Sequence, residues 1–240
     1  MYRYLAAFCL LLAACTPTPR TLQGPLAIEA SYRLLFNDAL VGQALFVLEI
    51  GRDGHYRLDA FTRPAGQMQN RADHEVLESS EGVLDAQGAR PERFEHSVMQ
   101  DGELELVGLK FDWAQQALWL EGPQPRRMAL LPDTQDRLSY LLAAHDLAAT
   151  GEGSRQLQVA SADAAEETIL EVTGQSVVEV PLGHYQATGI RRISPDPDEH
   201  RTLWFDTRLV PLPLRIVHQR DDNVVEMQLE EVNRRRSDPR

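Results

Sequence analysis

Residues 132–147 read PDTQDRLSYLLAAHDL, the clearest helical pattern in the chain outside its N-terminal leader. Asp133 is suited to start a helix, because its carboxylate can accept hydrogen bonds from the free N–H groups of the first turn. Asp136 adds negative charge where the helix dipole favours it. Mostly apolar side chains then recur at helical spacing, at Leu138, Leu141, Leu142 and His145. Gly151 and Gly153 follow as stop signals, so we expect a helix over about residues 133–148 with its leucines in the core.

The segments on both sides of this helix have the alternation of half-buried strands. Residues 225–230, for example, read VEMQLE, in which apolar and polar side chains alternate. Turn signals such as Asn37-Asp38 separate roughly a dozen such strands at intervals of about 8–12 residues. A break at Pro64-Ala65-Gly66 precedes a loop or short helix over Gln67 to Ala72, and Gly42 suggests a bulge. We predict a mainly β fold, in which a large curved antiparallel sheet or open β-barrel packs on one central helix.

The interior of such a fold has room for more than strand side chains. A barrel of about a dozen strands is too wide for its own side chains to fill. The central helix would fill part of this space, and the remainder would form a pocket.

The N-terminus has the pattern of an export signal. Residues 1–14 predict a signal peptide, because Arg3 precedes an apolar run from Leu5 to Leu12 that is too short to span a bilayer. The run ends in Leu12-Ala13-Ala14-Cys15, which resembles the lipobox of bacterial lipoproteins. In that class the cysteine receives a diacylglycerol, the signal is cut before it, and the new amine is acylated. We therefore expect lipidation at Cys15; the alternative is an ordinary secretory signal with an incidental cysteine.

The rest of the chain divides simply. Residues 15–26 form a Pro/Thr-rich tether of some 30 Å at about 3.1 Å per residue. Residues 27–232 are expected to form a single β domain, and the basic tail 233–240 to be disordered. Thr16 after the cysteine favours sorting of the lipoprotein to the outer membrane of a Gram-negative bacterium. We therefore expect the N-terminal lipid to attach the protein to this membrane, with its domain in the periplasm.

Cysteine content and net charge limit the disulfide bonds and the kinds of binding partner that the protein can have. Cys9 lies in the removed segment, so Cys15 has no partner for an internal disulfide. The net charge is −12, and loss of Arg3 with the signal leaves 23 basic and 36 acidic residues, or −13. A field of that sign does not favour nucleic acid, and we expect no nucleic-acid partner.

Several motifs resemble one family. The chain resembles domain-of-unknown-function family 3108, which groups predicted envelope proteins of Gram-negative bacteria, over about residues 28–232. The matching stretches are Tyr32 to Leu48, Glu81-Gly82-Val83-Leu84 with Phe111-Asp112-Trp113, Pro132 to Ser139, and Val180 to Tyr185 with Thr202-Leu203-Trp204 and Leu212 to Ile216. The resemblance implies a mostly β, exported and often lipid-anchored domain. The family has no settled activity.

No pattern predicts catalysis, a cofactor or a metal. Ser176 lacks the second glycine of a nucleophile elbow. The seven histidines are scattered without close metal-ligand spacing. The acidic loop with Asp196, Asp198 and Glu199 lacks the spacing of a calcium loop. Asp136 could act as a catalytic carboxylate, but it could instead form a structural ion pair with an arginine of the sheet such as Arg215.

Three functions remain open from the sequence. The first is a non-catalytic binding module whose interior holds an apolar ligand, suggested by the strand count and by aromatic residues at Trp113, Trp119, Trp204 and Phe205. The second is a structural or assembly factor that binds another envelope protein. The third is a hydrolase, which would require one serine, one histidine and one carboxylate to cluster.

Overall fold

Fifteen strands form one sheet in the computed structural model of the protein, which describes residues 25–71, 74–100, 103–122, 124–161, 164–194 and 196–235. The first half of the chain contains β1 (Leu26–Phe36), β2 (Ala39–Ile50), β3 (His55–Pro64), the 3₁₀-helix η1 (Gly66–Arg71), β4 (Glu75–Asp85), β5 (Gly88–Gln100), β6 (Glu103–Asp112), β7 (Ala117–Glu121) and β8 (Arg126–Ala129). The second half contains β9 (Thr134–Gln135), α1 (Ser139–Thr150), β10 (Ser154–Ala160), β11 (Ala165–Val180), β12 (Gly183–Ile193), β13 (Glu199–Phe205), β14 (Arg215–Arg220) and β15 (Asn223–Arg235).

The sheet is a meander interrupted by one long-range pairing. Its order is β8-β7-β6-β5-β4-β3-β2-β1-β15-β14-β13-β12-β11-β10-β9, and every neighbouring pair is antiparallel except β9 and β10. The first strand therefore pairs with the last one in the middle of the sheet, where Leu34 lies opposite Met227.

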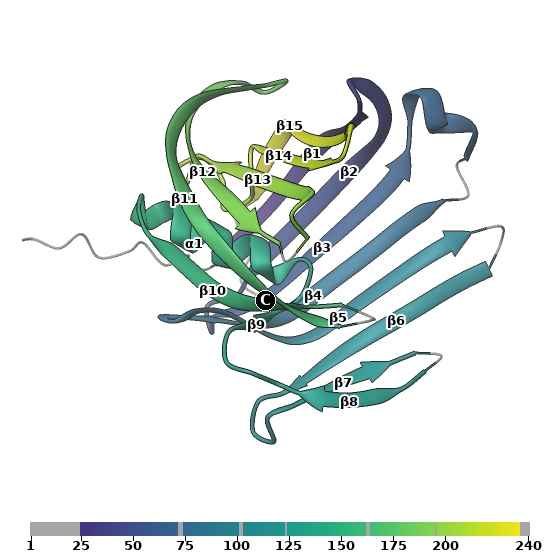
Figure 1. The fold of residues 1–240 in the computed structure, drawn as a ribbon, viewed down its shortest axis with the longest axis vertical. Coiled ribbons are helices and arrows are strands. Elements are labelled where there is room, and N and C mark those ends of the chain that lie inside the picture. The colour runs from purple at the N-terminus through teal and green to yellow at the C-terminus, as the bar shows by residue number, and fades with distance from the viewer. Residues whose placement is uncertain are drawn as a thin grey trace, which may run out of the picture.

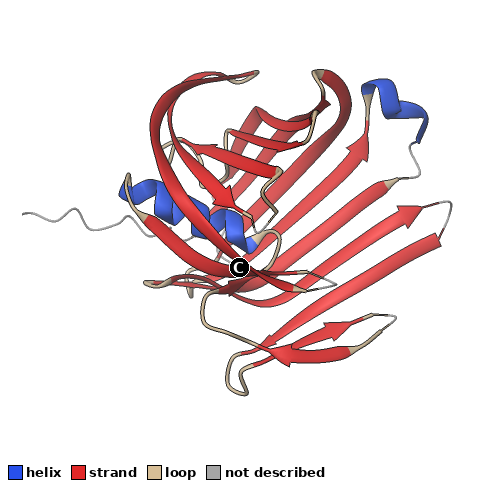
Figure 2. Cartoon of the chain, viewed as in Figure 1, coloured by secondary structure: helices blue, strands red, loops and turns tan. Residues whose placement is uncertain are grey.

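The sheet curls around α1, as Figures 1 and 2 show. The twelve strands from β5 through β1 and β15 to β9 form an incomplete barrel. Its two ends meet where the Gln135 side chain in β9 donates from Nε2 to the carbonyl oxygen of Ala89 in β5, at 2.8 Å. Strands β6 to β8 continue the sheet beyond this junction. The predicted curved sheet around one helix is confirmed.

The concave face of the sheet and α1 share one apolar core. Tyr32, Leu48, Leu58 and Leu229 are at most 1% exposed and belong to four different strands. The helix is buried on more than its leucine face, because Ala143, Ala144 and Ala148 are buried together with Leu138, Leu141 and Leu142. Side chains on the other face of β1 to β4 are more exposed, as the alternation predicts.

The helix begins later than the sequence predicts. It starts at Ser139 instead of Asp133 and ends at Thr150, followed by Gly151 in the left-handed conformation. Asp133 lies in a turn with φ of +57°, and its Oδ1 accepts a hydrogen bond from Arg155 at 2.8 Å. Thr134 and Gln135 between these two points form β9, and Asp136 accepts from the Leu138 and Ser139 N–H groups at the start of the helix.

Two further predictions concern the chain ends. The predicted disordered tail 233–240 is wrong for residues 233–235, since β15 continues to Arg235 and pairs with β1. Residues 236–240, the signal peptide, the tether up to residue 24 and Cys15 lie outside the described residues.

The predicted loop or short helix after Gly66 corresponds to η1. In the described ranges, no helix is long and apolar enough to cross a membrane.

Candidate functional site

An apolar pocket of about 300 Å³ lies between η1 and the concave face of β1 to β3. Leu34, Gly42 and Pro64 stand directly opposite one another on the three strands and line it, together with Thr62. Met68 of η1 also lines it, as do Val41, Arg63 and His74. The residue that precedes η1 is held to β2 by a hydrogen bond from the Ala65 N–H to the Val41 carbonyl oxygen, at 2.9 Å.

The backbone of β2 shapes this pocket. The pairing of β1 with β2 shifts between Leu34 and Leu35, which confirms a bulge beside Gly42. Because Gly42 has no side chain, its backbone faces the pocket between Leu34 and Pro64, and Val41 beside it also lines the pocket. The sequence marked Gly42 as a bulge, but it gave no sign that Met68 would lie across from it.

The apolar surface continues along the concave face next to the pocket. Phe36 on β1 lies opposite Val225 on β15, two residues beyond Leu34 and Met227. Phe36 and Val225 are each 41% exposed, although they lie on the same face as the buried core. Phe36 and Val225 therefore add exposed apolar surface next to the pocket-lining Leu34, and together we call them the apolar wall.

A second feature is the buried polar cluster at the start of α1. The Asp136 carboxylate accepts hydrogen bonds from the Leu138 and Ser139 backbone N–H groups, both at 2.8 Å, and from the Ser80 hydroxyl at 2.6 Å. The Asp136 N–H donates in return to Ser139 Oγ, which makes a reciprocal helix cap. The Tyr56 hydroxyl lies 3.1 Å from Ser80 Oγ.

The electrostatics of this cluster follow from its burial. Asp136 is fully buried, and burial raises the pKa of its carboxyl from 3.8 to about 6 against the opposing effect of its hydrogen bonds. Burial also raises the pKa of Tyr56 well above 10, and the nearby Asp136 adds to this effect. The carboxylate binds the start of α1 to the sheet. Its suggested pairing with Arg215 is wrong, because Arg215 binds Glu226 at 2.7 Å.

A polar cleft of about 420 Å³ lies at the opposite ends of β2 to β4. Charged side chains line much of it, among them Glu49, Arg57, Glu81 and Glu92. Arg57 forms ion pairs with Asp59 and Glu81. These walls suit an apolar ligand less well than the pocket beneath η1.

The four aromatic residues that suggested a binding interior do not line the apolar pocket. Phe205 is 1% exposed and packs against His145 of α1, with ring centroids 6.1 Å apart. Trp113 stacks on Phe111 and donates to the Pro91 carbonyl oxygen. Trp119 and Trp204 each lie beside an arginine guanidinium, from Arg127 and Arg215 respectively. Their role is packing and surface contact.

The acidic loop and its neighbours form ion pairs and hydrogen bonds. Asp196 binds Arg220 at 3.1 Å, and Glu199 lies 3.5 Å from Arg201 and 3.4 Å from His218. The Ser194 hydroxyl donates to Glu199 at 3.0 Å instead of to a histidine, so this group lacks the nucleophile–base hydrogen bond of a hydrolase. Within the described ranges, no three His, Cys, Asp or Glu side chains are placed to hold a metal ion.

A strongly curved open sheet that encloses a helix and leaves an apolar pocket at its rim defines a barrel-like β protein. The chain belongs to the family described as protein of unknown function (DUF3108), whose model matches residues 31–230. The resemblance drawn from the sequence motifs is thereby confirmed. No curated protein is significantly similar to the chain in sequence.

Solved structures support the fold. A β-barrel-like protein of the DUF1849 family from Brucella abortus is 14% identical, with a TM-score of 0.59, covering 87% of this chain and 97% of its own. A predicted exported protein with a YmcC-like fold from Bacteroides fragilis is 7% identical, with a TM-score of 0.40 and coverage of 89% and 98%. A predicted lipoprotein from Parabacteroides distasonis is 8% identical, with a TM-score of 0.35 and coverage of 88% and 96%. The last two are too distant to support an inference.

Proposed function

We propose that this protein is a lipid-anchored, non-catalytic binding module of the Gram-negative envelope, facing the periplasm from the outer membrane, and that its ligand is apolar. The observation that carries the proposal is the pocket beneath η1 and its continuation over Phe36 and Val225. Small-molecule sites range from about 300 to 1,000 Å³, so this pocket suits one hydrocarbon segment with the rest of the ligand along the wall.

The pocket can be tested by photo-crosslinking with a neutral probe, a hexadecanol that carries a diazirine in its chain, applied to the full-length protein. We expect crosslinks to peptides that contain Leu34, Thr62 or Met68. Met68→Glu should reduce the yield several-fold, because it places a charge in the apolar lining. Met99→Glu is the matched control: Met68 and Met99 are 41% and 39% exposed, and Met99 lies on the outer face of β5. Equal yields from the two variants, or no crosslink in the pocket, would refute the proposal.

The anchor has a separate test. Cys15→Ser should abolish incorporation of labelled palmitate and leave the protein unprocessed or soluble in the periplasm, because the acylated thiol is lost. Unchanged acylation and unchanged membrane fractionation would show that Cys15 is not the attachment site. Separation of inner and outer membranes on a density gradient tests the outer-membrane location inferred from Thr16.

A structural or assembly role is the second candidate, favoured by a different surface. Leu45, Phe61 and Leu77 stand directly opposite one another on the outer face of β2 to β4. Leu77 is 48% exposed, and Leu106 on β6 is 51% exposed on the same face. Crosslinking in whole cells separates the two roles, since one envelope protein captured at Leu77 would favour assembly and captured lipid would favour binding.

A further inference from the structure

Two arginines lie side by side on the concave wall formed by β12 to β14. Arg192 on β12 is directly opposite Arg201 on β13, and Arg201 is directly opposite His218 on β14. The three residues face inward, because they alternate with outward-facing neighbours and share a face with the buried Ile190 and Leu203. Like charges directly opposite on neighbouring strands destabilise a sheet, so this pair calls for a compensating group.

The protein supplies little compensation for Arg192. Its side chain is only 9% exposed, yet the nearest carboxylate in the described part of the chain is Glu166, at 3.8 Å and itself 57% exposed. Its Nε donates to the Thr168 hydroxyl at 3.4 Å, and its guanidinium carbon lies 5.9 Å from the centre of the Tyr140 ring. A nearly buried guanidinium with such distant partners is costly unless an anion is close.

The second guanidinium has several partners, including a hydrogen bond to the Tyr140 side chain, but they do not use all of its donors. Arg201 lies 3.5 Å from Glu199, and its Nη2 donates to His218 Nδ1 at 3.2 Å. Burial and the neighbouring Arg201 lower the pKa of His218, so the ring is neutral at neutral pH and can accept at Nδ1. Arg201 Nε is buried without a partner among the described residues. Two planar guanidinium groups with unused capacity are suited to a carboxylate or phosphate, which they can bind through paired hydrogen bonds.

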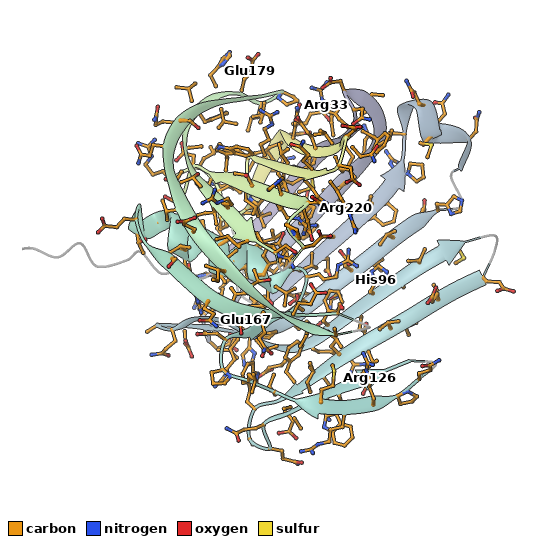
Figure 3. The ribbon with its side chains drawn as sticks, viewed as in Figure 1. Arg33, His96, Arg126, Glu167, Glu179 and Arg220 are labelled. Atoms are coloured by element: carbon orange, nitrogen blue, oxygen red, sulfur yellow. The ribbon has the colours of Figure 1, made fainter. Side chains whose placement is uncertain are left out.

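This pair and the apolar wall belong to one concave surface. The row that contains Arg192, Arg201 and His218 continues across the sheet to Val225 and Phe36. Neighbouring strands are about 4.8 Å apart, so three strand steps separate Arg201 from Phe36 by about 14 Å along the sheet. Figure 3 draws the side chains of this concave surface and labels His96 on β5 and Arg220 on β14. A hydrocarbon chain of moderate length can span the distance from the arginines to the pocket.

We infer that the ligand is an anionic amphiphile, whose carboxylate or phosphate head binds between Arg192 and Arg201 and whose chain follows Val225 and Phe36 into the pocket beneath η1. This inference rests on the proposed function, since it adds a head-group site to the apolar pocket. The head can belong to a fatty acid or a phospholipid; a free anion would need only the arginine pair.

Competition on the full-length protein tests the head group. The diazirine hexadecanol labels the pocket, and unlabelled palmitate, hexadecanol and inorganic phosphate serve as competitors. We expect palmitate to compete at a concentration about tenfold or more below that of hexadecanol, which is the scale expected for hydrogen bonds to a charged group. The double variant Arg192→Gln/Arg201→Gln should remove this advantage and leave competition by hexadecanol unchanged. Arg191→Gln, on the outer face beside them, is the control and should change neither.

The outcomes separate the head-group inference from the proposed function. Equal competition by palmitate and hexadecanol in the unaltered protein would overturn the inference while leaving the apolar pocket in place, and it needs no variant to fold. Absence of labelling by the alcohol probe would overturn the proposed function itself. Protection from thermal unfolding by inorganic phosphate that depends on Arg192 and Arg201, with no advantage for palmitate, would identify a site for a free anion and refute the amphiphile.

Discussion

Replacing Asp136 with asparagine should change how the stability of the protein depends on pH. The carboxyl has a pKa of about 6 in the folded protein and 3.8 as a free side chain, because burial disfavours its charge. The folded state therefore holds a proton that the unfolded chain loses between these two values. The resulting stabilisation is fully present below pH 3.8 and is lost as the pH rises through about 6. At about 1.36 kcal/mol per pKa unit, the difference corresponds to about 3 kcal/mol.

Asparagine preserves the shape of the cluster while removing the titration. Its Oδ1 can still accept from the Leu138 and Ser139 N–H groups, and its amide can donate to Ser80 Oγ. The free energy of unfolding of the unaltered protein minus that of Asp136→Asn should therefore fall by about 2 kcal/mol between pH 4 and pH 7, because part of the full difference is already lost at pH 4. Urea denaturation followed by tryptophan fluorescence at a series of pH values measures this difference.

A control variant separates this effect from a general change in net charge. Asp222→Asn removes the same charge from the exposed turn between β14 and β15. A difference between the unaltered protein and Asp136→Asn that stays constant from pH 4 to pH 7 would show that burial does not raise the pKa of Asp136, and would refute the reasoning.

Three further substitutions test the packing. Leu142→Ala should lower the free energy of unfolding by about 2–5 kcal/mol in urea denaturation, because Leu142 of α1 is fully buried. A loss below about 1 kcal/mol would contradict a tightly packed interior. Gly82→Ala should cost about 1–3 kcal/mol in the same assay, since a Cβ there would lie 2.7 Å from the Pro91 Cα; unchanged stability would mean that the β4–β5 bulge can adjust. Arg191→Ala should cost at most about 1 kcal/mol, because its pair with Glu171 is half-exposed, and a larger loss at high salt would refute a surface role.

The core of the fold could be predicted from local patterns. Alternation along β1, β3 and β15 correctly assigns Tyr32, Leu58 and Leu229 to the interior, because a strand with one buried face repeats every two residues. Gly151 correctly marks the end of the helix, since its left-handed backbone suits glycine. The start of the helix was not predictable in the same way: Asp133 and Asp136 are equally good caps in sequence, and the pairing of β9 with β10 decides between them.

The candidate sites depend on contacts that the sequence does not contain. Met68 reaches the pocket only because η1 folds back over β2 and β3. Arg192 and Arg201 become neighbours through the pairing of β12 with β13, across a loop whose length does not reveal the register. The large tryptophan side chains suggested a binding interior, yet they make packing and surface contacts instead. Composition could predict an apolar interior, but not which part of it remains open.

The pairing of the first and last strands of the sheet affects how the protein folds. β1 and β15 form the middle of the sheet, so neither half has its central neighbour until β15 has been synthesised. Contacts between such distant parts of a chain form slowly and leave strand edges open in the meantime. The nascent protein is therefore expected to depend on chaperones until β15 has paired with β1, and loss of residues 229–235 should be far more harmful than their place near the end of the chain suggests.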